Sequence, residues 1–126
     1  MRLFPKPVDT KGISPITLAF VGDGVYELMV REYLVTEANR PANMLHRSAV
    51  SMVRAEAQAA AFKKIEPLLT EEEVAVYKRG RNAHTSRNSA DYHQATGFEA
   101  LIGYLYLEDQ TDRLQELFSV ILEDKK

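Results

Sequence analysis

The segment from Asp91 to Leu107 constrains the fold of this chain more than any other. Its second half carries apolar side chains in nearly every direction around a helix axis, at Phe98, Leu101, Ile102, Tyr104 and Leu105. A helix that is apolar all round has to be covered by other elements. We therefore expect a central helix over this segment, surrounded by the rest of the chain.

Four other segments repeat apolar residues at helical spacing, and none alternates as a strand would. The first opens at Ser14-Pro15, an N-cap followed by a residue favoured in the first turn, and should end near Val35. The second should run from Asn43 to about Ile65, because its alanine-rich stretch has high helix propensity and Pro67 follows it.

The third segment starts at Thr70, with Glu73 in a capping-box position, and should stop at Gly80. Residues 81–89 are polar and basic, which indicates a loop. The last segment, from about Asp112 to Glu123, is amphipathic. The sequence thus predicts an all-α fold, a helical bundle.

Composition limits the other possibilities. The chain has 126 residues, of which 45% are hydrophobic, so we expect a single domain over 1–126, with 1–13 as an extended N-terminal segment. Charges interrupt every apolar run, which predicts no membrane span. Cysteine is absent, which excludes disulfides and thiolate metal sites and fits a cytoplasmic location. No Gly-rich phosphate loop of the Walker type occurs.

The charge distribution points to nucleic acid, although the net charge of −2 does not. From Val74 to Ala90 there is no Asp or Glu. The same stretch contains the potential phosphate and sugar donors Lys78, Arg79, Arg81, Asn82, His84 and Arg87. This pattern predicts an RNA-binding patch, although a charge run can also be plain solvated surface. His46 and Arg47, at the start of the second helix, could add contacts, but simple surface exposure explains them equally well.

Two carboxylates stand in costly positions, where we expect burial. Asp23 lies between Gly22 and Gly24 inside the first helix, and helical glycines cost on the order of 1 kcal/mol each. Glu99 lies in the most apolar helix, where a carboxylate needs a cation or several donors. The two acids could share Mg²⁺, which takes oxygen ligands and keeps several waters. Alternatively, the glycines mark tight helix packing and each acid pairs with Arg or Lys.

Two motifs resemble those of the ribonuclease III family. Residues 18–25, Leu-Ala-Phe-Val-Gly-Asp-Gly-Val, resemble the family's signature, and residues 98–107 resemble its second acidic motif. Pro41–Arg47 and Lys78–Ala83 resemble motifs of the Mini-ribonuclease III branch. The absence of a double-stranded-RNA-binding domain after the catalytic unit also points to that branch. The resemblance runs from about Thr17 to Leu117.

The resemblance implies a ribonuclease III-like endonuclease domain that works as a homodimer. Asp23 and Glu99 match the family's catalytic metal ligands, for Mg²⁺ with Mn²⁺ as an alternative. Ala19 and Thr96 stand where the full-length family has two further carboxylates, so we count them, with Gly22, as site-adjacent. The basic loop is several residues shorter than is usual in the branch.

The resemblance also implies a reaction. It is hydrolysis of double-stranded RNA to 5′-phosphate products, with the precursor of large-subunit (23S) ribosomal RNA as natural substrate. Two other functions stay open: a non-catalytic RNA-binding or ribosome-associated protein on the same fold, and a helical dimerisation module. Retention of Asp23 and Glu99 favours the enzyme, whereas Ala19 and Thr96 favour the binding protein.

Overall fold

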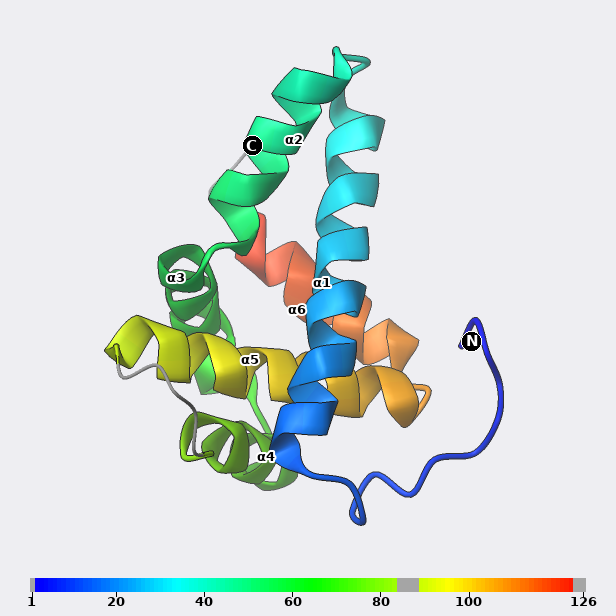
Figure 1. The fold of residues 1–126 in the computed structure, drawn as a ribbon, viewed down its shortest axis with the longest axis vertical. Helices are drawn as coiled ribbons and strands as arrows, with labels where there is room; N and C mark the ends of the chain where they lie inside the picture. Colours follow the sequence, from blue (N-terminus) through cyan, green and yellow to red (C-terminus); the bar gives the residue numbers. More distant parts are fainter. Residues whose placement is uncertain (1, 84–88, 124–126) are drawn as a thin grey trace.

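The computed structural model describes residues 2–83 and 89–123, which form helices and, within these ranges, no strand (Figure 1). The elements are α1 (Pro15–Glu37), α2 (Ala42–Val53), α3 (Ala55–Ile65), the 3-10 helix η1 (Glu66–Leu68), α4 (Glu71–Arg81), α5 (Ala90–Leu107) and α6 (Thr111–Ile121). The predicted all-α class is confirmed. None of these helices is both long and apolar enough to cross a membrane.

Helix α5 is the centre of the fold, as its apolar circumference predicts. It packs against α1, α3, α4 and α6, and α1 crosses it in Figure 1. Residues 95–98 and 100–105 are all buried. The Tyr26 ring of α1 packs edge-on against the Phe98 ring, with 4.9 Å between the ring centroids. Burial of this kind, on the order of 25 cal/mol per Å² of apolar surface, holds the bundle together.

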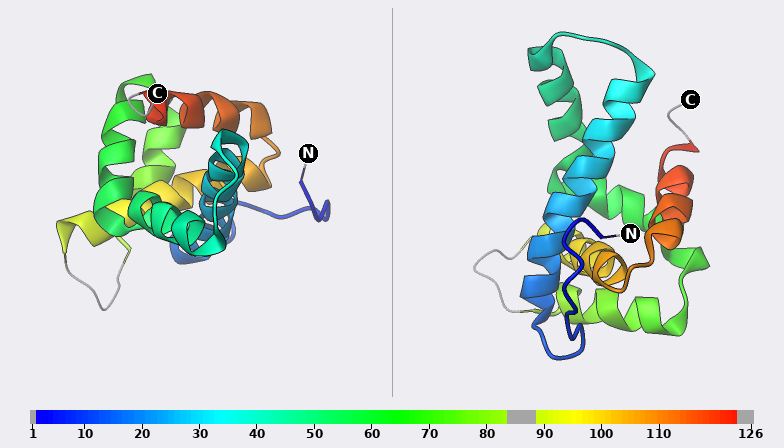
Figure 2. Two further views of the ribbon diagram at one scale, coloured as in Figure 1. Left: turned by 90° about the horizontal axis from the view of Figure 1, so that it is seen from above. Right: turned by 90° about the vertical axis from the view of Figure 1, so that its right-hand side faces the viewer.

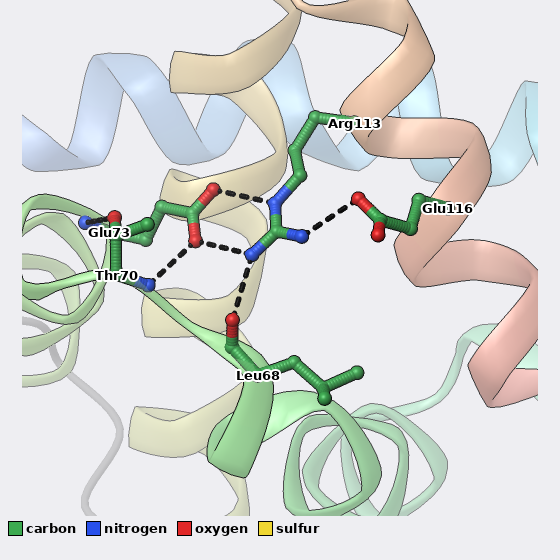
Figure 3. A network of polar contacts seen from close by, with 5 residues as sticks. All are labelled: Leu68, Thr70, Glu73, Arg113 and Glu116. Carbon is green, nitrogen blue, oxygen red and sulfur yellow. Dashed lines mark hydrogen bonds and ion pairs between the residues drawn. The ribbon is translucent and has the colours of Figure 1, made fainter.

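The helix starts follow the local capping signals. The Ser14 hydroxyl accepts the Thr17 backbone N–H at 3.1 Å, and Thr70 and Glu73 form a complete capping box. Arg113 of α6 then donates two hydrogen bonds to the Glu73 carboxylate, at 2.8 and 2.9 Å, and a third to the Leu68 carbonyl (Figure 3). This network attaches α6 to the start of α4.

The prediction of one helix from Asn43 to Ile65 is wrong. Arg54, with φ −69° and ψ 161°, is extended and separates α2 from α3. Helix α2 packs along α1, whereas α3 packs along α5, and a straight helix could not follow both. Tertiary packing therefore overrides the high helix propensity of the alanine-rich stretch.

The prediction that a helix stops at Gly80 is also wrong, because α4 continues to Arg81. A Cβ atom on Gly80 would lie 2.7 Å from the Cβ of Ala100 and 2.9 Å from the Cα of Gly97. Gly80 is therefore a packing residue between α4 and α5 rather than a C-terminal signal.

The N-terminal segment, residues 2–13, contains no helix or strand and runs outside the helical body (Figure 2). Two hydrogen bonds attach this segment to the C-terminal end of α5. The buried Thr10 hydroxyl donates to the Glu108 carboxylate at 2.7 Å, and the Leu3 backbone N–H donates to the Tyr106 hydroxyl.

Candidate functional site

The crossing of α1 over α5 is a contact between backbones. A Cβ on Gly22 would lie 1.7 Å from the Glu99 carbonyl oxygen, and one on Gly103 would lie 2.0 Å from the Leu18 carbonyl oxygen. Only glycine permits such an approach. Asp23, the neighbour of Gly22, is thereby brought next to Glu99. The packing explanation of Gly22 and the metal-site explanation of Asp23 are thus compatible.

The surroundings of Glu99 favour its protonated form. The pKa of Glu99 is raised to about 7, mainly by burial and also by the neighbouring Asp23, while a hydrogen bond from Gln58 acts in the opposite direction. Glu99 is half-buried, but Asp23 is exposed, so the expectation of burial is wrong for Asp23. The pair forms a site of surplus negative charge that opens to solvent at Asp23.

This donor set fits a hard divalent cation. Within residues 2–83 and 89–123, no group of three or more His, Cys, Asp or Glu side chains could hold a metal. The pair Asp23 and Glu99 offers carboxylate oxygens only, and Mg²⁺ is commonly held by one or two carboxylates while it keeps several waters. A cation between them would also offset the burial and, to a lesser extent, the negative charge of Asp23, which together raise the pKa of Glu99.

The predicted site-adjacent residues pack in the interior and supply no carboxylate to the site. Ala19 is only 6% exposed and belongs to the hydrophobic core. Thr96 is buried, and its hydroxyl donates to the Tyr92 carbonyl at 2.9 Å. Gly22 supplies the close contact with Glu99. Positions 19 and 96 therefore add no carboxylate ligand to the pair Asp23 and Glu99.

Four of the predicted RNA contacts, Lys78, Arg79, Arg81 and Asn82, lie at the C-terminal end of α4. Lys78, Arg79 and Asn82 are exposed, while the Arg81 guanidinium lies 5.7 Å above the Tyr77 ring. Because Gly80 packs on Thr96 and Gly97, this end of α4 lies about one helical turn from Glu99 along α5. Cations at a helix C-terminus also stabilise the helix itself. The predicted contacts His84 and Arg87 fall outside the described residues.

His46 and Arg47 do not join this group. Both are exposed on α2, which lies at the opposite end of the molecule from α4 in Figures 1 and 2. His46 lines a hollow of about 190 Å³ between α1 and α2, together with Arg31 and Leu45. Within one chain, those predicted RNA contacts that the structure describes therefore form two separate groups.

Sequence reasoning missed Gln58. This residue of α3 is only 2% exposed, and its side-chain amide donates to Oε2 of Glu99 at 3.1 Å. The available signal was a polar amide within the alanine-rich stretch, on the helix face that carries Ala61, Phe62 and Ile65. The high helix propensity of this stretch predicts a helix but gives no indication of a contact with Glu99.

Known proteins are similar to this chain in sequence and in fold. The family model described as Ribonuclease III domain matches residues 16–110. The Mini-ribonuclease 3 of Symbiobacterium thermophilum is 49% identical over 110 residues, covering 83% of this chain and 85% of that protein. That of Enterococcus faecalis is 47% identical over 118 residues, covering 88% and 89%. A crystal structure of a protein from Fusobacterium nucleatum superimposes with a TM-score of 0.84 at 29% identity, covering 94% and 98%.

Proposed function

Because the chain belongs to the ribonuclease III family, in its Mini-ribonuclease III branch, we propose that it is an endoribonuclease that cuts double-stranded RNA with a divalent metal ion. The observation that carries the proposal is the glycine-mediated crossing of α1 and α5, which brings Asp23 next to Glu99. A protein that only binds RNA has no need for two carboxylates of like charge in contact.

In the proposed reaction, Asp23 and Glu99 hold Mg²⁺, or Mn²⁺ in its place. When bound, the ion supplies an activated water and stabilises the charge that builds on the phosphate. Glu99 has to be ionised to bind it, and the donated hydrogen bond from Gln58 favours that form. Hydrolysis leaves a 5′-phosphate and a 3′-hydroxyl.

The basic residues at the end of α4 would bind the RNA backbone beside the site. Lys78, Arg79 and Asn82 are exposed there and present donors suited to phosphate and ribose. Because A-form RNA hides its base edges in a deep, narrow major groove, recognition would depend on shape, phosphate and 2′-hydroxyl groups. The natural substrate we propose is the precursor of 23S ribosomal RNA, in the cytoplasm.

The proposal includes a homodimer, which an unpartnered face of α1 supports. Phe20 is 80% exposed and Leu28 46% exposed, on the same helix face as Gly24, where an added Cβ would meet no described residue within 4 Å. Gly24 and Leu28 belong to the lining of an open groove of about 640 Å³, together with Val25, Met29, Phe118 and others. A two-fold axis at this face would place the Phe20 ring of each copy in the groove of the other copy. Two sites, one for each RNA strand, would then lie on one particle.

The decisive test of the function is incubation with a long RNA duplex in Mg²⁺, with a chelator in a parallel reaction and a single strand of the same sequence as control. We expect cleavage of the duplex only, only with metal, and products that carry 5′-phosphates. Duplex binding without cleavage would favour the non-catalytic binding protein. No salt-dependent binding at all would favour the dimerisation module.

The dimer has a separate test. Phe20→Ser should convert the particle to monomers in sedimentation velocity, because it places a polar group at the centre of the interface. Val50→Ser, which changes an exposed apolar residue of α2 outside the lining of the groove, is the control and should leave the dimer intact. A wild-type monomer at all accessible concentrations would contradict the proposed assembly.

A further inference from the structure

The side chain of Gln58 connects the second carboxylate to the junction between α2 and α3. Its Nε2 donates to the Val53 carbonyl at 2.7 Å and to Oε2 of Glu99 at 3.1 Å. Val53 is the last residue of α2, so its carbonyl is one of those that a helix end leaves without an intrahelical partner. The backbone N–H of Gln58 bonds to Arg54, the residue at which the helix is interrupted.

These two contacts decide which way the amide points. A backbone carbonyl can only accept a hydrogen bond, so the NH₂ end has to face Val53. Both amide hydrogens are then used, one by Val53 and one by Glu99. The other end, Oε1, is buried and has no hydrogen-bond partner among the described residues. A buried unpaired acceptor is unfavourable for folding, which makes a role beyond packing the better explanation of this amide.

We propose that Gln58 is a positioning residue for metal binding: it holds Oε2 of Glu99 and leaves the other oxygen for the cation shared with Asp23. The break at Arg54 contributes to this arrangement, because it leaves the Val53 carbonyl free of an intrahelical partner and so able to accept a hydrogen bond from the Gln58 amide. The inference rests on the proposed metal site. A site with few protein ligands depends strongly on such support, since no third carboxylate among the described residues compensates when one ligand rotates away.

Direct measurement of Mn²⁺ binding, from the loss of the free-ion electron paramagnetic resonance signal without RNA, tests the inference. Gln58→Met keeps the length of the side chain but donates no hydrogen bond. We expect it to weaken Mn²⁺ binding about 10- to 100-fold, the usual effect of removing a group that orients a metal ligand. The metal concentration for half-maximal cleavage should rise by the same factor, while the rate at saturating metal changes less.

Two variants separate the possible outcomes. Ile65→Val removes a buried methyl group from the same helix, lowers stability, and should leave Mn²⁺ affinity unchanged. Asp23→Asn should abolish Mn²⁺ binding. If the Asp23→Asn variant binds Mn²⁺ like the wild type, the assignment of the metal site is wrong, and the proposed role of Gln58 is wrong as well. If Asp23→Asn loses binding but a folded Gln58→Met keeps wild-type affinity, only the inference about Gln58 is overturned.

The wild-type protein offers a measurement that does not depend on a variant folding. The side-chain amide protons of Gln58 should exchange slowly with solvent, and their nuclear magnetic resonance signals should shift when Mg²⁺ is added. Signals that do not move over a titration that saturates the site would overturn the inference.

Discussion

Two glutamates of this protein, Glu73 and Glu99, lie in contrasting surroundings. Glu73 is almost fully buried, but Arg113 donates two hydrogen bonds to it and the Thr70 backbone a third, and these contacts lower its pKa. Glu99 is less buried, yet it has one neutral amide donor and a second acid beside it, and its pKa is raised. A carboxylate whose partners are complete supports the fold, whereas one whose partners are incomplete is available to bind a cation.

The largest effect should come from removing the charge at the incomplete site. Asp23→Asn and Glu99→Gln are nearly isosteric, and each should reduce cleavage of an RNA duplex to background while the helical circular dichroism is kept. The double variant should be hardly worse than either single one, since both residues serve one ion. Losses that multiply would show that the two acids act independently.

Breaking the complete site should instead affect stability. Arg113→Met leaves the Glu73 carboxylate buried without its cation, and we expect a loss of about 2–3 kcal/mol in the free energy of unfolding, because one partner of a largely buried ion pair is removed. Urea denaturation measures this loss. Glu116→Gln, at the exposed second partner of Arg113, is the control and should change stability by less than about 0.5 kcal/mol. Cleavage per folded molecule should be unchanged in both variants.

In the metal-free protein, ionisation of Glu99 and of Glu73 should change the stability of the fold in opposite directions as the pH rises. The pKa of Glu99 is raised to about 7 in the folded protein, so its ionised form is destabilising above that pH. Glu99→Gln should therefore unfold at a higher temperature than the wild type at alkaline pH, and the difference should disappear as the pH falls below the ordinary carboxyl pKa.

At Glu73 the folded pKa is lowered, so its stabilising contribution is present above the ordinary carboxyl pKa and is lost as the pH falls through the lowered value. Glu73→Gln should be less stable than the wild type at neutral pH, with the difference narrowing in acid. Parallel pH profiles for the two Gln variants would contradict the contrast between the sites.

The smallest effect concerns the basic end of α4, measured in the Asp23→Asn background so that binding is separated from cleavage. If Lys78 contacts phosphate, Lys78→Ala should flatten the slope of log affinity against log salt concentration by roughly one unit or less. Lys63→Ala is a matched control, because Lys63 is also an exposed lysine in the last turn of a helix. Equal slopes for the two variants would remove this end of α4 from the RNA-binding surface.

The sequence by itself determined the features that depend on residues close together in the chain. The caps at Ser14 and Thr70 involve residues within one helical turn, and the central position of α5 follows from its own apolar circumference. The order of the motifs around Asp23 and Glu99 identified the family in the same way. Each of these signals can be recognised without knowing what the segment packs against.

The tertiary structure alone decided the features that join distant segments. The break at Arg54 arises because α2 and α3 follow different helices, and the hydrogen bond from Gln58 to Glu99 spans 41 positions in the chain. Gly80 has the local signature of a helix end, but the atoms of α5 decide its role. Backbone packing between α1 and α5 brings the two acids together, and no property of either segment alone specifies the distance between them.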